Sequence, residues 1–299
     1  MDRSLESHCN RSATARAASV TVGQCSVSAS YPRPKCDRFL TAIKAPSGRR
    51  STVAHVTFAL SISSRNALPA EPLIAGKVLA IIVAARRLRA DAQAGRSVKT
   101  LRGKNLALLL SMPAAMDAAN LRHAAQELGI RVADVRFTEP ATPGQDDVQA
   151  VARMLGRMYD AIDCGTLAAS TVRQIEREAG VPVYDGLGSD NHPVRAMADL
   201  MTLCEHRFPP EAGTALLFLG DAQTFRGRAF VAAAREIGFE VRIETSRREA
   251  SNDASVVVDA TQSPDWSLQV SGNPVDEARR SENHRCVIQT MLIDTIAKA

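Results

Sequence analysis

The chain has 299 residues, which is enough for one large or two medium α/β domains. Its net charge of +5 suggests a nucleic-acid partner at first. However, residues 1–66 alone carry ten Lys/Arg and three Asp/Glu, so the other 233 residues sum to −2. The part of the chain expected to fold therefore lacks the basic surface of a nucleic-acid-binding protein, and we expect no such partner.

Residues 1–66 form a basic extension rich in Ser, Ala and Arg. This composition buries too little apolar surface to offset chain entropy, so we expect the extension to be disordered. Two other interpretations stay open. One is a transit peptide, against which Asp2 and Glu6 argue, and the other is a start codon placed too far upstream.

The cysteine pattern and the longest apolar stretch bear on the compartment of the protein and on whether it binds a metal or spans a membrane. The six cysteines contain no CxxC pair and no metal-ligand spacing, which predicts a reduced, cytoplasmic protein without a metal site. The apolar stretch at 73–85 is interrupted by Lys77 and is too short to span a bilayer, so we expect no membrane partner.

The first elements in chain order alternate between helices and strands. An amphipathic helix is expected to begin at about 74 and to end near Gly95, with basic residues in its last turns. The continuous apolar run at 105–110 predicts a buried strand. Further on, we expect helices at 114–128, 148–159, 171–179 and 193–206, and strands at 131–137, 161–163 and 182–184.

The segment at 208–213, FPPEAG, interrupts this pattern and predicts a domain boundary. A second cycle follows, with strands at 214–219, 239–243 and 255–258 and helices at 227–237 and 289–297. The alternation predicts an α/β fold of two doubly wound parallel-sheet domains. Ligands of such sheets bind beyond the carboxyl ends of the strands, which here are the turn at Ser111 and the loops at 185–193, Asp221 and Asp259.

Three segments carry a resemblance to a known family: ARMLGRMYDAID at 152–163, VPVYDGLGSDNHPVRAMADLMTLCEH at 181–206 and LLFLGDAQTFRGRAFVAAAREIGFEVRI at 216–243. Together they resemble the aspartate/ornithine carbamoyltransferases, nearest the ornithine branch. The resemblance implies a carbamoyl-phosphate domain, an amino-acid domain and assembly as trimers. We accordingly expect a carbamoyl-phosphate-binding-like domain at 67–208, a shortened ornithine-binding-like domain at 209–280, and a C-terminal helix at 281–299 that packs back on the first domain.

The resemblance implies that His192 is catalytic and binds the carbamoyl phosphate by donating to its carbonyl oxygen, and that Arg195 replaces some of the missing phosphate contacts. The other interpretation is a His-Pro loop kept for its geometry, with Arg195 in solvent. The family's His-Pro-x-Gln motif reads His192-Pro193-Val194-Arg195 here, so the histidine is retained and an arginine replaces the amide. The family's Glu-Asn-Arg appears as Glu282-Asn283-His284. His284 is then either a weak donor to the carbamoyl oxygen or a surface residue, and we expect the surface residue.

The phosphate-binding positions of the family are degenerate in this chain. The Ser-Thr-Arg-Thr-Arg turn corresponds to Ala114, Ala115, Met116, Asp117 and an alanine, so its hydroxyls and guanidinium groups are absent. A second phosphate-binding arginine corresponds to Gly165. The helix amides remain as anion donors.

The amino-acid-binding positions are partly retained. Asp259 and Ser263 match the family's Asp-x-x-x-Ser-Met-Gly loop and are expected to position the amino acid, although an ordinary strand-end turn is the other interpretation of Asp259. Thr224 stands where the family has an asparagine that holds ornithine, and the family's His-Cys-Leu-Pro segment is absent.

Three hypotheses for function follow. The first is an ornithine carbamoyltransferase-like protein, converting carbamoyl phosphate and L-ornithine to L-citrulline and phosphate with impaired or absent activity. The second is a non-catalytic paralogue that binds a metabolite or assembles with an active carbamoyltransferase, and the third is a decayed gene product. We expect small-molecule ligands, a homotrimer or mixed oligomer, and no cofactor, because Gly220 and Gly227 do not form a dinucleotide-binding motif.

Overall fold

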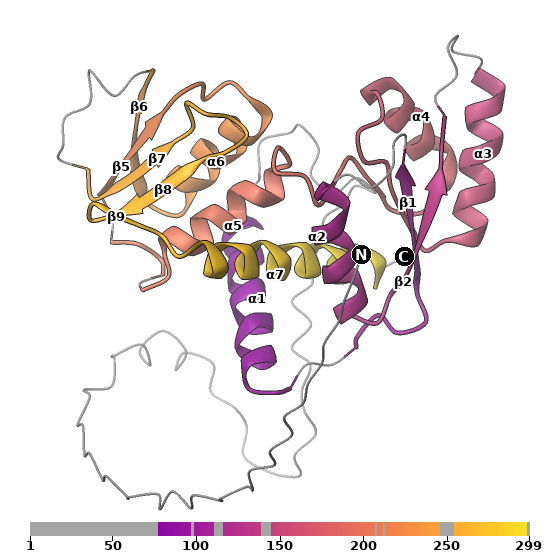
Figure 1. The fold of residues 1–299 in the computed structure, drawn as a ribbon, viewed down its shortest axis with the longest axis horizontal. Helices are drawn as coiled ribbons and strands as arrows, with labels where there is room; N and C mark the ends of the chain where they lie inside the picture. Colours follow the sequence, from indigo (N-terminus) through magenta and orange to yellow (C-terminus); the bar gives the residue numbers. More distant parts are fainter. Residues whose placement is uncertain are drawn as a thin grey trace, which may run out of the picture. The chain divides into compact units, whose positions relative to one another are not determined.

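A computed structural model describes most of the chain beyond residue 76 (Figure 1). The described residues are 77–96, 99–110, 116–138, 145–206, 208–211, 213–245 and 254–297. The expected extension at 1–66 lies outside them, as do Ala114 and Ala115. Met116 and Asp117 are the first residues of a helix that the structure describes, but their side chains are not among the described ones.

The first sheet is parallel, as predicted, with the strand order β2-β1-β3-β4. The continuous apolar run forms its central strand because both faces of that strand are buried. Leu106 and Leu108 belong to the core cluster that also contains residues of α1, α2, α5 and α7, whereas Ala107 and Leu109 pack with α3 and α4. The strands are β1 Asn105–Leu110, β2 Arg131–Arg136, β3 Ala161–Asp163 and β4 Val183–Tyr184.

Six helices precede the C-terminal one in the described chain. One contact among them demands a glycine: a Cβ on Gly156 would lie 1.8 Å from the carbonyl oxygen of Ala179, so only glycine lets α3 approach the end of α4 this closely. These helices are α1 Lys77–Gln93, α2 Met116–Glu127, α3 Gln145–Met158, α4 Ala169–Ala179, α5 Pro193–Leu203 and α6 Phe225–Glu236.

The second sheet combines parallel and antiparallel strands in the order β6-β5-β7-β8-β9. Its three parallel strands were predicted, but β8 and β9 were not, and both pair antiparallel. They are four and two residues long, too short to show a recognisable period. The strands are β5 Thr214–Leu219, β6 Phe239–Glu244, β7 Val256–Asp259, β8 Ser267–Val270 and β9 Asn273–Pro274.

The C-terminal helix α7, Glu277–Ile296, begins well before the apolar run at 289 and slightly before the C-terminal helix that the resemblance implies at 281–299. The apolar pattern indicates only its second half because Arg280, Asn283 and His284 face the interior in the first half, so polar residues occupy the positions where a core helix normally carries apolar ones. Asp276 caps the helix by accepting hydrogen bonds from two backbone amides. Helix α7 packs against α1, α2 and α5 (Figure 1).

None of the helices in the described part of the chain is both long and apolar enough to cross a lipid bilayer.

Candidate functional site

The loop after β3 is built around a buried carboxylate. Asp163 is 5% exposed and accepts hydrogen bonds from the backbone amides of Leu187, at 2.8 Å, and Gly165, at 3.2 Å. Burial raises the pKa of Asp163 to about 7, although these amide donors act in the opposite direction. The carboxylate therefore joins the end of β3 to the loop that leads to His192.

Gly165, where the resemblance expects a phosphate-binding cation, has a left-handed backbone with φ of +55°. A Cβ at this position would lie 3.1 Å from the carbonyl oxygen of Leu109, which is a tight contact. The local backbone therefore favours glycine over any residue with a charged side chain.

His192 is the N-cap of α5, and Pro193 follows at the first helical position. Its Nδ1 accepts a hydrogen bond from the backbone amide of Val194 at 3.2 Å. Because that ring nitrogen is an acceptor, the proton of the neutral ring lies on Nε2. Burial lowers the pKa of His192 to about 4, so the ring is neutral at pH 7 and can donate Nε2–H to a ligand oxygen.

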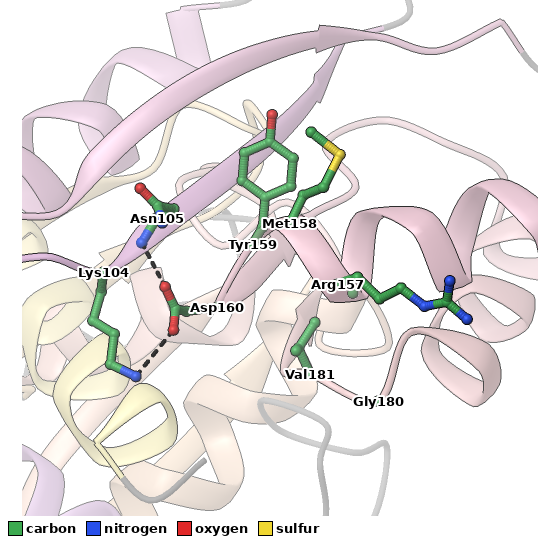
Figure 2. A pocket seen from close by; sticks show the side chains of 9 residues that line it. Lys104, Asn105, Arg157, Met158, Tyr159, Asp160, Gly180 and Val181 are labelled. Carbon is green, nitrogen blue, oxygen red and sulfur yellow. Dashed lines mark hydrogen bonds and ion pairs between the residues drawn. The ribbon is translucent and has the colours of Figure 1, made fainter.

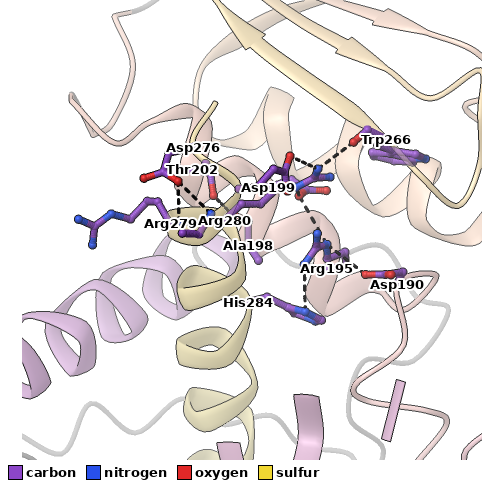
Figure 3. Close-up of polar contacts among 12 residues, drawn as sticks. Asp190, Arg195, Ala198, Asp199, Thr202, Trp266, Asp276, Arg279, Arg280 and His284 are labelled. Carbon is purple, nitrogen blue, oxygen red and sulfur yellow. Dashed lines mark hydrogen bonds and ion pairs between the residues drawn. The ribbon is translucent and has the colours of Figure 1, made fainter. Parts of the chain in front are cut away.

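Arg195 is held on several sides, and its side chain is only 12% exposed. Its Nε lies 3.3 Å from Asp190 and 3.8 Å from Asp199, and its Nη1 lies 3.2 Å from Nδ1 of His284 (Figure 3). The two side chains that depart from the family pattern at 195 and 284 are thus in direct contact.

His284 is 1% exposed, so the expectation that it lies on the surface is wrong. The reason is that α7 begins early and turns this residue towards α5. Burial first, and then the charge of Arg195, lower the pKa of His284 to about 3. Its Nε2 is buried and has no hydrogen-bond partner among the described residues.

Asp199 is a completely buried carboxylate that binds arginines from α6 and α7. Arg280 lies 2.8 Å from its Oδ1 (Figure 3). Arg226 lies 2.6 Å from its Oδ2. Burial alone would raise the pKa of Asp199, but Arg226, Arg280 and Arg195 outweigh burial and hold it below the usual value.

The sequence interpretation missed this ionic cluster. One signal was available: an aspartate within the apolar face of a predicted helix, since Asp199 lies between the buried Ala198 and Leu200. A carboxylate in such a position needs a buried partner of opposite charge.

The arginines of the cluster also hold the loop that precedes β8. Arg226 donates to the carbonyl oxygen of Pro264 at 2.9 Å, and its guanidinium lies 3.9 Å from the ring centroid of Trp266. Arg280 donates to the carbonyl oxygen of Trp266 at 2.8 Å. The side chain of Trp266 in turn packs edge-on against Phe218 and Phe230 in the core of the second sheet.

The residues expected to bind the amino acid serve their own loops. Asp259 accepts hydrogen bonds from the amide and the hydroxyl of Thr261, at 3.0 and 2.6 Å, as an ordinary strand-end turn residue would. Thr224 caps α6 by accepting from the amide of Gly227 at 3.0 Å. Among the described residues, no contact joins Asp259 or Ser263 to His192 or Arg195.

A separate hollow of about 350 Å³ lies at the opposite edge of the first sheet, where β1 and β3 begin (Figure 2). Its polar groups pair with one another: Asp160 accepts from the Nζ of Lys104 at 3.0 Å and from the amide of Asn105 at 2.8 Å. The hollow therefore lies away from the strand ends that carry His192.

Comparisons with known proteins agree with this geometry. Residues 65–205 match the carbamoyl-P binding domain of the aspartate/ornithine carbamoyltransferases. The chain is 31% identical to an ornithine carbamoyltransferase of Actinobacillus pleuropneumoniae serotype 5b over 158 residues, which are 53% of this chain and 47% of that protein. The chain thus spans about half the length of the curated relative that it matches.

Solved structures of the same fold cover more of the chain. The catalytic subunit of M. jannaschii aspartate transcarbamoylase aligns with a TM-score of 0.60 and 14% identity, over 79% of this chain and 100% of that one. The ornithine carbamoyltransferase from Gloeobacter violaceus aligns with a TM-score of 0.51 and 21% identity, over 74% and 94%. Residues 65–205 are thus similar in sequence to the carbamoyl-P binding domain of the aspartate/ornithine carbamoyltransferases, and most of the chain shares the fold of these enzymes.

Proposed function

We propose that this chain is an ornithine carbamoyltransferase-like protein whose carbamoyl transfer, from carbamoyl phosphate to L-ornithine with release of L-citrulline and phosphate, is strongly impaired. The proposal includes the division into 67–208, 209–280 and 281–299, a homotrimer or mixed oligomer, and a cytoplasmic location.

The state of His192 is the observation that carries the proposal. Its ring is buried and neutral, and the amide of Val194 holds it as an Nε2–H donor. Such a donor can polarise a carbonyl oxygen on which negative charge develops during transfer. His192 is therefore preorganised to bind the carbonyl oxygen in the reaction.

The phosphate-binding side supports only slow turnover. Glycine at 165 and alanines at 114 and 115 supply no cation for the phosphate. Hydrogen bonds to charged groups contribute about 2 kcal/mol each, so two lost cation contacts amount to about 4 kcal/mol. This loss corresponds to roughly a thousandfold in rate.

Citrulline formation by the full chain tests the proposal, with an active ornithine carbamoyltransferase assayed in parallel. We expect turnover roughly a thousandfold below that of the active enzyme. The matched variant is His192→Asn, because asparagine still caps α5 but lacks the Nε2 donor, and we expect it to abolish the remaining turnover. His123→Asn changes an exposed histidine and serves as the control. Turnover equal to that of the active enzyme, or unchanged by His192→Asn, would contradict the proposal.

A non-catalytic paralogue is the second candidate. It is favoured by the hydrogen bonds of Asp259 and Thr224 within their own turns, which orient these side chains toward their loops. This function predicts no citrulline from the folded chain and a mixed oligomer with the active enzyme. Size-exclusion chromatography of the two proteins, alone and together, separates it from the first candidate.

A further inference from the structure

Strand β6 is an edge strand of the second sheet (Figure 1). It pairs with β5 on one side, and among the described residues no strand pairs with its other side. Its six residues, 239–244, read Phe-Glu-Val-Arg-Ile-Glu. An edge strand of this length presents a row of backbone donors and acceptors with which a strand of another chain can pair.

The hydrogen bonds between β6 and β5 show which backbone groups face the open edge. The carbonyl oxygen of Glu244 accepts from the amide of Gly220, the residue that follows β5, at 2.8 Å. Backbone groups of successive residues point to opposite sides of a strand, so the even-numbered residues of β6 bond to β5. The odd-numbered residues Phe239, Val241 and Ile243 therefore turn their amides and carbonyl oxygens to the open edge.

The exposed side chains of β6 are one acid, one base and one apolar residue. Glu240 and Arg242 project from one face of the strand, and both are exposed. Val241 and Ile243 project from the other face, where Val241 packs against the core and Ile243 is 43% exposed. The strand thus carries opposite charges two residues apart, which is the spacing at which a strand can pair its charges with a second copy of itself.

A second copy of β6 fits this edge in one antiparallel register. With Val241 opposite Val241 on a two-fold axis, Phe239 lies opposite Ile243 and Glu240 lies opposite Arg242, each of these pairs occurring twice. The odd-numbered pairs then exchange their free backbone hydrogen bonds, about six in all. The Glu–Arg pairs occupy the positions without backbone hydrogen bonds, where facing side chains approach most closely.

Other registers bring like charges together. A slide of two residues in one direction places Arg242 opposite Arg242 and Glu240 opposite Glu244, and the same slide in the other direction places Glu240 opposite Glu240. A slide of one residue sets the free backbone groups opposite residues that already bond to β5. Charged residues often protect an edge strand from association, but in the register centred on Val241 these charges attract.

We propose that β6 pairs with β6 of a second copy of this chain in the register centred on Val241, so that two five-stranded sheets form one continuous sheet about a two-fold axis. This inference goes beyond the proposed function and does not depend on carbamoyl transfer. The contact doubles whatever assembly the rest of the chain forms, giving a dimer from a monomer or a hexamer from a trimer.

Charge reversal tests the contact in sedimentation equilibrium of the full chain. Glu240→Arg or Arg242→Glu converts both Glu–Arg pairs into like-charge pairs, and we expect each variant to raise the dissociation constant of the doubled assembly by about thirtyfold. Arg136→Glu makes the same reversal at an exposed arginine of β2, an edge strand of the first sheet, and should leave the mass unchanged.

Mixing the two variants separates loss of the contact from loss of folding. In a mixed pair, each arginine of Glu240→Arg lies opposite a glutamate of Arg242→Glu, so an equimolar mixture should regain the doubled mass. The double variant Glu240→Arg/Arg242→Glu should regain it by itself. The proposal would be overturned by an unmodified chain that forms no doubled assembly, by a doubled mass that both reversals leave unchanged, or by a mixture that does not recover it.

Hydrogen exchange of the unmodified chain tests the register without any substitution. NMR at two protein concentrations measures the exchange rate of each amide in β6. The amides of Phe239, Val241 and Ile243 should exchange more slowly at the higher concentration, because they donate to the second copy only in the doubled assembly. The amides of Glu240 and Arg242 already bond to β5 and should change least. Equal exchange at both concentrations for the three odd-numbered residues would overturn the proposal.

Discussion

Replacing Asp163 by asparagine should remove the pH dependence of stability that this position contributes. The carboxylate is buried at the end of β3, and its pKa is raised from 3.8 to about 7, mainly by burial. The folded state therefore binds this proton more tightly than the unfolded state does. The free energy of unfolding should fall as the pH rises from about 4 to about 7, and should stay low above that.

The size of the effect follows from the shift. Three pKa units at about 1.36 kcal/mol each give a loss of about 4 kcal/mol across the whole range, of which about 2.5 kcal/mol falls between pH 5 and pH 8. An asparagine side chain at this position would keep one acceptor oxygen for the amide of Leu187 but lose the acceptor for Gly165, at a cost of about 1 kcal/mol. Asp163→Asn should therefore lie within about 0.5 kcal/mol of the unmodified protein at pH 5 and be more stable than it by about 3 kcal/mol at pH 8.

Urea denaturation of the full chain and of Asp163→Asn at pH 5, 6, 7 and 8 measures this difference, because groups shared by both proteins cancel. Asp265→Asn is a suitable control, because it makes the same substitution at an exposed position. A stability difference between the unmodified protein and Asp163→Asn that stays constant from pH 5 to pH 8 would refute the reasoning.

Three further changes test other parts of the structure. Asp199→Asn leaves Arg226 and Arg280 without their buried carboxylate and should destabilise the fold by about 3–5 kcal/mol in urea denaturation; a loss below about 1 kcal/mol would contradict the ionic cluster. Gly156→Ala places a methyl group against the carbonyl of Ala179 and should lower the melting temperature through a loss of about 1–3 kcal/mol. Gly165→Arg should cost about 1–2 kcal/mol in stability because φ is positive there, yet tighten phosphate binding in calorimetry; tightening without a stability cost would argue against the strained backbone.

Much of the fold could be predicted because the central strands of its sheets are buried on both faces. The bounds of β1, β3 and β5 agree with the predicted ranges, since continuous apolar runs with turn residues at both ends identify such strands directly. The short β8 and β9 offer no such pattern. The antiparallel half of the second sheet depends on tertiary pairing with β7, which no local sequence signal encodes.

The candidate site was predictable only in part. His192 could be found because its motif also caps a helix and is therefore local. The burial of His284 could not be predicted, because it depends on ion pairs that join α7 to α5. In one of these pairs, Asp199 and Arg280 are 81 residues apart in the chain. Polar side chains that neutralise one another in the interior have the same composition as an exposed surface, so a hydrophobic pattern cannot distinguish the two.

The packing of α7 on α1 has a consequence for the rate at which the protein folds. Arg89 and Asn283, which share a hydrogen bond, are 194 residues apart in the chain, and Arg86 contacts the carbonyl oxygen of Cys204 across 118 residues. Contacts of such sequence separation form slowly because the loop between them must first be closed. Until α7 docks, the apolar face of α1 that carries Val78 and Ile82 lacks its cover. We therefore expect a slow refolding phase during which aggregation competes with docking of this helix, and a yield that falls as protein concentration rises.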